Sequence, residues 1–182
     1  MTVLAVLSLL IWLSLIALHG RFWQAGPILT PARPSTAPSV AVVVPARDEA
    51  EAIRDSLTSL LAQDYAGAFR VILVDDGSTD GTGAIARALG DPRLTVLTGA
   101  DRPPGWSGKL WAVAQGLEEA RESAFVLLTD ADIVHDPRHV STLVAHAVRD
   151  DRDMVSEMVA LACDSWAERA LVPAFVFFFQ LL

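Results

Sequence analysis

Two aspartates separated by one alanine, Asp130 and Asp132, are the residues of this sequence best suited to bind a metal ion. They follow an apolar run, Phe125 to Thr129, that is typical of a buried strand. Mg²⁺ and Mn²⁺ take oxygen ligands, and such ions are often held by one or two carboxylates together with water and the phosphates of a ligand. A metal in that position can neutralise a diphosphate leaving group as its bond breaks. We therefore expect Asp130 and Asp132 to bind Mg²⁺ or Mn²⁺.

The same spacing of carboxylates occurs a second time, in Asp151-Arg152-Asp153. This copy lies in a charged stretch after a segment with amphipathic helical periodicity, so a solvated loop is its expected structure. Spacing alone is therefore weak evidence for a metal site. The position at the end of a strand is what favours Asp130 and Asp132.

Short apolar runs alternate with helical patterns through the middle of the chain. We expect strands at 40–44, 70–74, 94–97 and 125–129, and helices at 48–62, 80–89, 108–120 and 137–149. This alternation predicts an α/β fold, a mostly parallel sheet with helices on both faces. The first two runs are apolar without alternation, which is typical of central strands buried on both faces. Ligands of such sheets bind beyond the carboxyl ends of the strands.

Polar residues follow the first two expected strands. The first strand runs into Pro45-Ala46-Arg47-Asp48-Glu49, in which Asp48 is a candidate cap for the next helix. The second ends in Asp75-Asp76-Gly77-Ser78-Thr79-Asp80-Gly81, a turn whose amides could face an anion, with an ordinary polar turn as the alternative. Neither this turn nor the segment from Gly105 to Leu110 has the glycine spacing of a dinucleotide-binding fingerprint or a P-loop.

Composition limits the class of partner. The formal net charge is −8, from 22 acidic and 14 basic residues, whereas a nucleic-acid surface needs many cations against the phosphates. We therefore expect no nucleic-acid partner. The single cysteine, Cys163, excludes an internal disulfide and cannot alone build a structural zinc site.

The N-terminal run from Thr2 to Leu18 contains no charged residue and predicts a transmembrane anchor over residues 1–20. A cleaved signal peptide is the alternative, but no A-x-A site follows the run. Arg21 and Arg33 come next, and no acidic residue precedes Asp48, so the positive-inside rule places the following domain in the cytoplasm. We expect a single-pass protein of the inner (cytoplasmic) membrane, with a proline-rich linker at residues 21–38.

Four segments of the chain occur in the order and spacing seen in family 2 glycosyltransferases. They are Pro45 to Glu49, Asp75 to Asp80, Gly108-Lys109 with Ala112, and Asp130 to Asp132. Through them the chain resembles the N-terminal part of this family from about Ser39 to Asp136. The resemblance implies a GT-A (Rossmann-like) nucleotide-sugar-binding domain over residues 39–162, followed by a truncated acceptor region whose apolar tail is residues 163–182. More narrowly, the N-terminal run, the segment 103–109 and the Phe-rich segment 173–180 resemble the hopanoid-associated bacterial glycosyltransferases.

The resemblance also implies roles for individual residues. Metal ligation falls to Asp132, and Asp130 contacts the ribose or the metal. The donor-binding residues implied with them are Pro45, Ala46 and Glu49 in the nucleotide pocket, Asp75 at the base, Asp76 beside it, and Lys109 near the phosphates. The implied donor is a nucleotide-diphosphate sugar, most often a UDP-sugar, and the implied acceptor is a lipid or another membrane-associated molecule. Gln115 departs from the family pattern, because many relatives carry Asn there.

Family members of this kind also use a carboxylate general base, contributed well after the metal motif. Glu157, Asp164 and Glu168 come too early to match it, so we assign no catalytic base. The apolar tail is either an interfacial helix or a core element. We expect His135, His139 and His146 to be surface or capping residues. Two alternative functions remain: a donor-binding fragment without turnover, and a sugar-phosphate nucleotidylyltransferase.

Overall fold

The structure of the protein is a computed structural model, which describes residues 2–18 and 29–181. The chain divides into two compact units. One unit is Thr30–Ser156 and contains the sheet, and the other combines Met1–Leu29 with Glu157–Leu182. Residues 21–28 of the predicted linker lie outside the described residues, and residues 29–38 contain no helix or strand.

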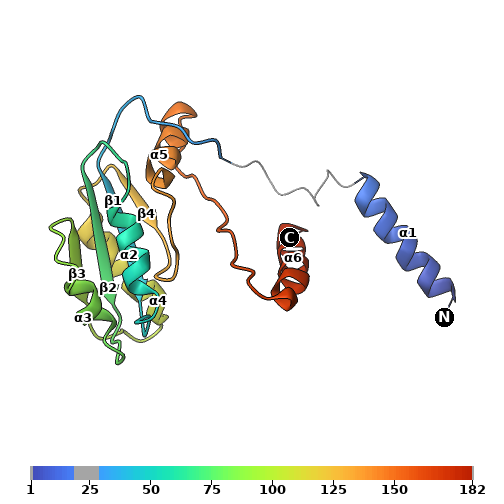
Figure 1. The fold of residues 1–182 in the computed structure, drawn as a ribbon, viewed down its shortest axis with the longest axis horizontal. Helices are drawn as coiled ribbons and strands as arrows, with labels where there is room; N and C mark the ends of the chain where they lie inside the picture. Colours follow the sequence, from blue (N-terminus) through green and yellow to red (C-terminus); the bar gives the residue numbers. More distant parts are fainter. Residues whose placement is uncertain (1, 19–28, 182) are drawn as a thin grey trace. The chain divides into compact units, whose positions relative to one another are not determined.

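A four-stranded parallel sheet forms the centre of the first unit (Figure 1). Its strands are β1 (Val40–Ala46), β2 (Phe69–Asp75), β3 (Leu94–Thr98) and β4 (Phe125–Leu128), in the order β3-β2-β1-β4. The prediction of a parallel α/β sheet is confirmed. The unbroken apolar runs form the two central strands, β1 and β2, as expected for strands covered on both faces.

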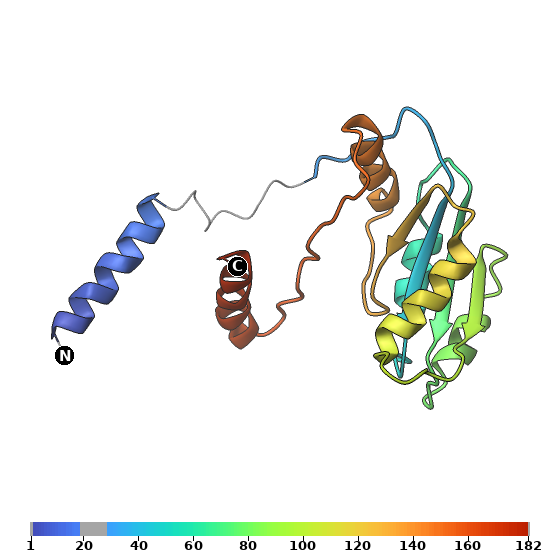
Figure 2. The same ribbon diagram turned by 180° about the vertical axis from the view of Figure 1, so that it is seen from behind.

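Helices cover both faces of the sheet, as Figures 1 and 2 show from opposite sides. They are α2 (Ile53–Leu61), α3 (Thr82–Arg87), α4 (Gly108–Ala120) and α5 (His139–Arg149). Alternate strand residues point to opposite faces, so Val42 and Val44 pack in the core cluster that includes α2 residues. Ala41 and Val43 pack instead with residues of α4. Each unbroken apolar strand therefore supplies two separate cores.

Helix α4 lies very close to the sheet because Gly116 has no side chain. A Cβ atom at this position would come within 2.3 Å of Val43 Cγ1 and 3.3 Å of Val74 Cγ2. This close approach determines where the first turn of α4 lies relative to the strand ends. Glycine at position 116 thus helps to position Gly108 and Lys109.

Helix α2 begins at Ile53, later than the sequence predicts, and Asp48 does not cap it. The cap position is Ala52, which makes no side-chain capping hydrogen bond. The Asp48 carboxylate instead accepts hydrogen bonds from the Thr79 amide (2.7 Å) and the Thr79 hydroxyl (3.3 Å), in the loop after β2. The capping prediction is wrong because a partner distant in sequence takes the carboxylate.

The second unit contains α1 (Thr2–Leu18) and α6 (Trp166–Leu181). Ser165 and Glu168 form a reciprocal capping box at the start of α6, with Ser165 N donating to Glu168 Oε2 at 2.7 Å and Glu168 N donating to Ser165 Oγ at 3.2 Å. The sequence predicts a membrane-spanning anchor over residues 1–20. Within residues 2–18 and 29–181, no helix is both long and apolar enough to cross a bilayer.

Candidate functional site

A pocket of about 340 Å³ lies at the carboxyl ends of all four strands. Every strand contributes to it through the segment that follows the strand, as the rule for open parallel sheets predicts. Its lining residues are Pro45, Ala46, Arg47, Glu49, Asp76, Arg102, Gly108, Lys109, Ala112, Asp130, Ala131 and Asp132. The four sequence segments that carry the family resemblance therefore meet in one place.

All of the predicted donor- and metal-binding residues line this pocket except Asp75. The Asp75 carboxylate accepts a hydrogen bond from the Ser78 amide at 3.0 Å, within its own loop. A Cβ atom on Gly83 would lie only 2.2 Å from the other oxygen of this carboxylate, Asp75 Oδ2. In this structure Asp75 thus shapes the turn after β2, and base binding by Asp75 stays a prediction.

The loops after β1 and β2 are joined by hydrogen bonds that position the pocket wall. The Glu49 amide donates to Thr82 Oγ1 at 2.8 Å, and the Ala50 amide donates to Asp80 Oδ2 at 2.8 Å. The buried Thr82 hydroxyl in turn donates to Asp80 Oδ1 at 2.6 Å. The Thr82 hydroxyl, followed by the Ala50 amide, lowers the pKa of Asp80 below its ordinary value. The charged Asp80 carboxylate therefore links the loop after β1 to the loop after β2 through hydrogen bonds.

Helix α4 points its N-terminus at the pocket. Ser107 caps this helix, with the Leu110 amide donating to Ser107 Oγ at 3.4 Å, and Gly108, Lys109 and Ala112 line the pocket. A Cβ atom on Gly108 would lie 2.7 Å from Asp76 Oδ2, so the helix starts directly against the end of β2. The unpaired amides and the dipole of a helix N-terminus favour an anion such as phosphate.

The charged side chains of the pocket are partly paired with one another. Lys109 Nζ lies 2.5 Å from Asp130 Oδ1, and Arg47 Nη1 lies 3.7 Å from Asp76 Oδ2. Arg102 makes no ion pair with any residue in the described parts of the chain. Sequence reasoning missed Arg102. Its position could have indicated a pocket residue. Arg102 lies between the third strand and the helix at 108–120, and the residues that follow parallel strands reach the same edge of the sheet.

Asp130 and Asp132 both line the pocket, one on each side of a buried alanine. Ala131 between them is 3% exposed, and the two aspartates are on the exposed side of this segment and both line the pocket. Within residues 2–18 and 29–181, no group of three or more His, Cys, Asp or Glu side chains could hold a metal. Two carboxylates with the remaining ligands from phosphates and water fit Mg²⁺ or Mn²⁺.

Two other sequence predictions concern nearby side chains. The prediction that His135 is a surface or capping residue is wrong, because His135 is 8% exposed and its ring contacts Thr129 and His139. Gln115 is not among the lining residues, and its side-chain oxygen accepts a hydrogen bond from the Ala100 amide at 2.7 Å. Gln115 thus anchors the segment that leads from β3 to α4, and the change from Asn to Gln affects that anchor rather than the pocket wall.

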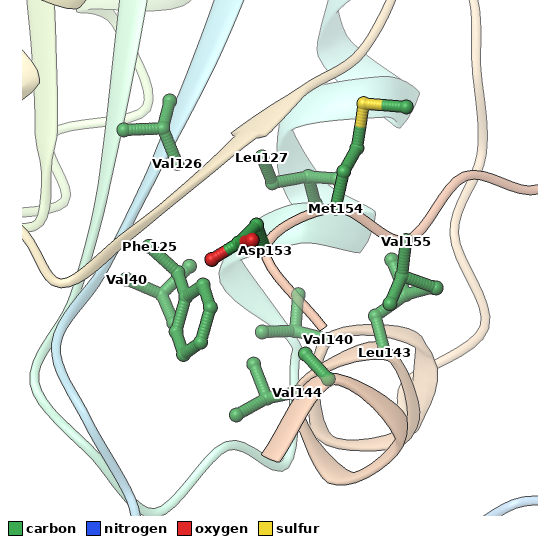
Figure 3. Close-up of a pocket in the computed structure, with 11 residues that line it drawn as sticks. Val40, Phe125, Val126, Leu127, Val140, Leu143, Val144, Asp153, Met154 and Val155 are labelled. Atoms are coloured by element: carbon green, nitrogen blue, oxygen red, sulfur yellow. The ribbon is translucent and has the colours of Figure 1, made fainter. Parts of the chain in front are cut away.

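A second cavity, of about 110 Å³, lies between β1, β4, α5 and the chain after α5 (Figure 3). Its lining is almost entirely aliphatic and aromatic, and Asp153 is its one charged side chain. Such a surface cannot neutralise a diphosphate. Residues 151–153 are exposed, as predicted for the second copy of the aspartate pair.

Comparison with known proteins supports the family resemblance. The family model described as "Glycosyl transferase family 2" matches residues 41–180. A curated relative, the 4,4'-diaponeurosporenoate glycosyltransferase of Staphylococcus aureus, is 35% identical over 95 residues, which are 52% of this chain and 24% of the relative. The mannosyltransferase PcManGT from Pyrobaculum calidifontis, solved in complex with GDP-Man and Mn²⁺, is similar in fold with a TM-score of 0.55 and 29% identity. That match covers 70% of this chain and 37% of the mannosyltransferase.

The chain spans about a quarter of the length of that curated relative, since 24% of it is matched. The named relatives are a carotenoid-acid glycosyltransferase and a mannosyltransferase, so they do not support the narrower resemblance to the hopanoid-associated enzymes.

Proposed function

The chain belongs to glycosyl transferase family 2, and we propose that its pocket binds a nucleotide-diphosphate sugar with Mg²⁺ or Mn²⁺ and contributes to transfer of the sugar. One observation carries this proposal. Four separate segments of the chain line a single pocket at the strand ends, through Pro45 and Glu49, Asp76, Lys109, and Asp132. A pocket with both carboxylates and cations suits a metal-bound diphosphate better than an uncharged ligand.

Each side of the proposed pocket has a distinct task. Pro45, Ala46 and Glu49 form the wall toward the nucleoside, with Asp76 beside it. Lys109 and the N-terminus of α4 face the diphosphate, and Arg102 supplies a further cation. Asp130 and Asp132 would hold the divalent cation, which when bound supplies positive charge to the leaving diphosphate. The pocket thereby favours departure of the nucleotide.

One ion pair of the pocket competes with metal binding. Lys109 Nζ lies 2.5 Å from Asp130 Oδ1, so the ammonium group and a metal ion compete for this carboxylate. The incoming diphosphate offers Lys109 a new anionic partner. Both side chains are more than half exposed, 63% for Lys109 and 54% for Asp130, so this exchange needs no opening of the core.

The acceptor and the location form the second part of the proposal. The curated relative is named for a carotenoid acid, an apolar molecule. Helix α1 exposes large apolar side chains along its length, including Val3 at 80% and Leu10 at 57%. An exposed apolar surface of this kind favours contact with a membrane. We propose a lipid or membrane-associated acceptor, with the domain at the cytoplasmic face of the inner membrane; the sequence resemblance adds hopanoid lipids to the acceptors to test.

A donor-binding unit without turnover is the second candidate function. It is favoured by the share of the curated relative that the chain spans, 24%, and by the absence of an assigned general base. In this case the rest of a longer polypeptide supplies the base and the acceptor site.

Calorimetry with UDP, GDP and their sugars, with and without Mn²⁺, tests the donor proposal. We expect binding that strengthens at least about tenfold with the metal, since the ion links two carboxylates to the phosphates. Nucleotide release in the presence of vesicles carrying an apolar acceptor then separates the two candidates. Metal-dependent binding with no release would support the donor-binding unit, and the absence of any metal-dependent binding would contradict both.

A further inference from the structure

Two histidines, the buried His135 and the half-buried His139, follow the aspartate pair of the pocket along the chain. The rings of His135 and His139 are stacked, with centroids 4.7 Å apart and planes at 15°. The two Nδ1 atoms lie 2.9 Å from each other, within hydrogen-bond distance. His135 is 8% exposed, in a segment where Asp132 and Asp136 are both exposed. A polar side chain is rarely buried in this way unless its nitrogen atoms are used.

His135 connects the two ends of the segment that carries Asp130 and Asp132. Its Nε2 lies 3.2 Å from Thr129 Oγ1, and Thr129 immediately precedes Asp130. The Thr129 amide donates to Val43 O at 3.3 Å, which ties this end of the segment to β1. At the other end the His135 amide donates to Ser59 Oγ on α2 at 2.9 Å. The ring therefore closes a loop whose ends are held by the sheet and by a helix.

Resting on the proposed function, we infer that His135 is a positioning residue that closes the 129–135 loop through Thr129 and so directs both aspartates toward the metal. Buried Ala131 holds the middle of this loop in the core cluster. With both ends and the middle held, the exposed Asp130 and Asp132 have little freedom to separate. A metal site gains affinity when the protein orders its ligands before the ion arrives.

The proton arrangement of the pair keeps the contact with Thr129 in either tautomer. One Nδ1 atom has to carry a hydrogen and the other has to accept it. If His139 donates, His135 carries its hydrogen on Nε2 and donates it to Thr129 Oγ1. If His135 donates, its Nε2 accepts a hydrogen from the Thr129 hydroxyl instead. Burial, and to a smaller extent His139, lowers the pKa of His135 to about 4, so the ring is neutral at pH 7.

A buried histidine that only fills space would behave differently from a positioning residue. Replacing it by a ring of similar size would preserve packing and leave metal binding unchanged. Loss of the Thr129 contact, in contrast, should weaken metal binding and leave metal-free nucleotide binding unaltered. Partners that orient metal ligands typically contribute about 10- to 100-fold in metal affinity.

The test uses the full 182-residue chain and Mn²⁺, titrated in the presence of saturating UDP or GDP and followed by the spin resonance signal of free Mn²⁺. We expect His135→Phe to weaken Mn²⁺ binding roughly tenfold, and nucleotide binding measured by calorimetry without metal to change less than about twofold. His135→Gln should recover most of the loss, because its amide can reach Thr129.

Thr129→Val removes the same contact from the other side with little change in volume, and Thr95→Val is its matched control, because Thr95 is an exposed residue of β3. We expect Thr129→Val to lower the affinity for Mn²⁺. The double variant with His135→Phe should lose no more Mn²⁺ affinity than the weaker-binding single variant, because both changes remove the same contact. Thr95→Val should bind Mn²⁺ like the parent chain. If His135→Phe fails to fold by circular dichroism, Thr129→Val decides the question.

Two outcomes are distinguishable. If the parent chain shows no Mn²⁺-dependent nucleotide binding, the proposed function fails. If the parent binds Mn²⁺ and nucleotide but folded Thr129→Val and His135→Phe bind both as tightly, the positioning role is overturned and the proposed function stands.

Discussion

Two pairs of aspartates with the same spacing lie in very different parts of this molecule. Asp130 and Asp132 follow β4 and line the pocket at the strand ends. Asp151 and Asp153 follow α5, in a segment that is exposed throughout. The difference shows that the spacing of two carboxylates acquires meaning only from the element that precedes them.

The second pair terminates a helix. Asp151 has a positive φ of 46°, and the Arg152 amide donates to Ala147 O at 2.9 Å. With Asp150 as the cap of α5, this hydrogen bond is the outer bond of a Schellman motif, in which the residue after the cap is left-handed. Asp tolerates that conformation better than most residues. Local chain geometry therefore explains Asp151 without a ligand.

The largest expected difference between the two pairs is in metal-dependent binding. Asp132→Ala should weaken Mn²⁺-dependent binding of UDP or GDP by at least about 100-fold, because removing a ligand costs more than removing a partner that orients one. Asp153→Ala should change it less than about twofold. Calorimetry on both variants measures this contrast, and an equal loss in the two would show that position after β4 is not what matters.

The basic residue beside each pair should show the next largest contrast. Lys109 contacts Asp130, whereas Arg152 lies inside the second motif. We expect Lys109→Met to lower the affinity for the metal-bound nucleotide about tenfold, since a hydrogen bond to a charged group contributes about 1.5–3 kcal/mol. Arg152→Met should leave it unaltered. Binding of Mn²⁺ alone should not weaken in Lys109→Met, because Asp130 loses a competing cation.

Glycine substitution should affect the two pairs in opposite ways. Asp151→Gly relieves a left-handed conformation and should raise the free energy of unfolding by up to about 1 kcal/mol, with nucleotide binding unchanged. Asp130→Gly should reduce metal-dependent binding and give no such gain. Urea unfolding with parallel calorimetry measures both quantities, and a loss of stability in Asp151→Gly would exclude the Schellman assignment.

The smallest effect concerns acid stability. The pKa of Asp80 at the pocket wall is lowered by Thr82 and Ala50, and that of Asp150 at the end of α5 is lowered by Arg149. A carboxylate with a lowered folded-state pKa stabilises the fold above its ordinary pKa and loses that contribution as pH falls through the lower value. We therefore expect stability to fall below about pH 4, and to fall less steeply in Asp80→Asn or Asp150→Asn. Thermal unfolding between about pH 3 and 5 measures how steeply stability changes with pH in the parent and in each variant. The parent and the variants should show the same slope if neither carboxylate is paired in solution.

Much of the fold was predictable because its signals are local. Unbroken apolar runs mark β1 and β2 as central strands, and the alternation of strands and helices predicts the parallel sheet. A parallel sheet brings all strand ends to one edge, so a list of residues after each run already names most of the pocket. Asp132 is found this way without any structure.

Other features depend on partners distant in sequence. Asp48 does not cap α2 and instead accepts a hydrogen bond from the Thr79 amide, which is 31 residues away. The His135 amide donates to Ser59 Oγ, which lies 76 residues away on α2. A single histidine in a polar stretch carries no periodic signal that could reveal such a partner.

The sequence by itself thus determined the family, the sheet and the residues that gather at its edge, because apolar periodicity and strand polarity are properties of neighbouring residues. Only the tertiary structure showed that Asp130 and Asp132 line one pocket with residues from the other strand ends, and that Asp151 is the left-handed residue after the cap of α5. It also decided that Lys109 pairs with Asp130 and that the His135 ring contacts Thr129. The physical reason is that hydrogen bonds and ion pairs are chosen among groups that meet only after the chain has folded.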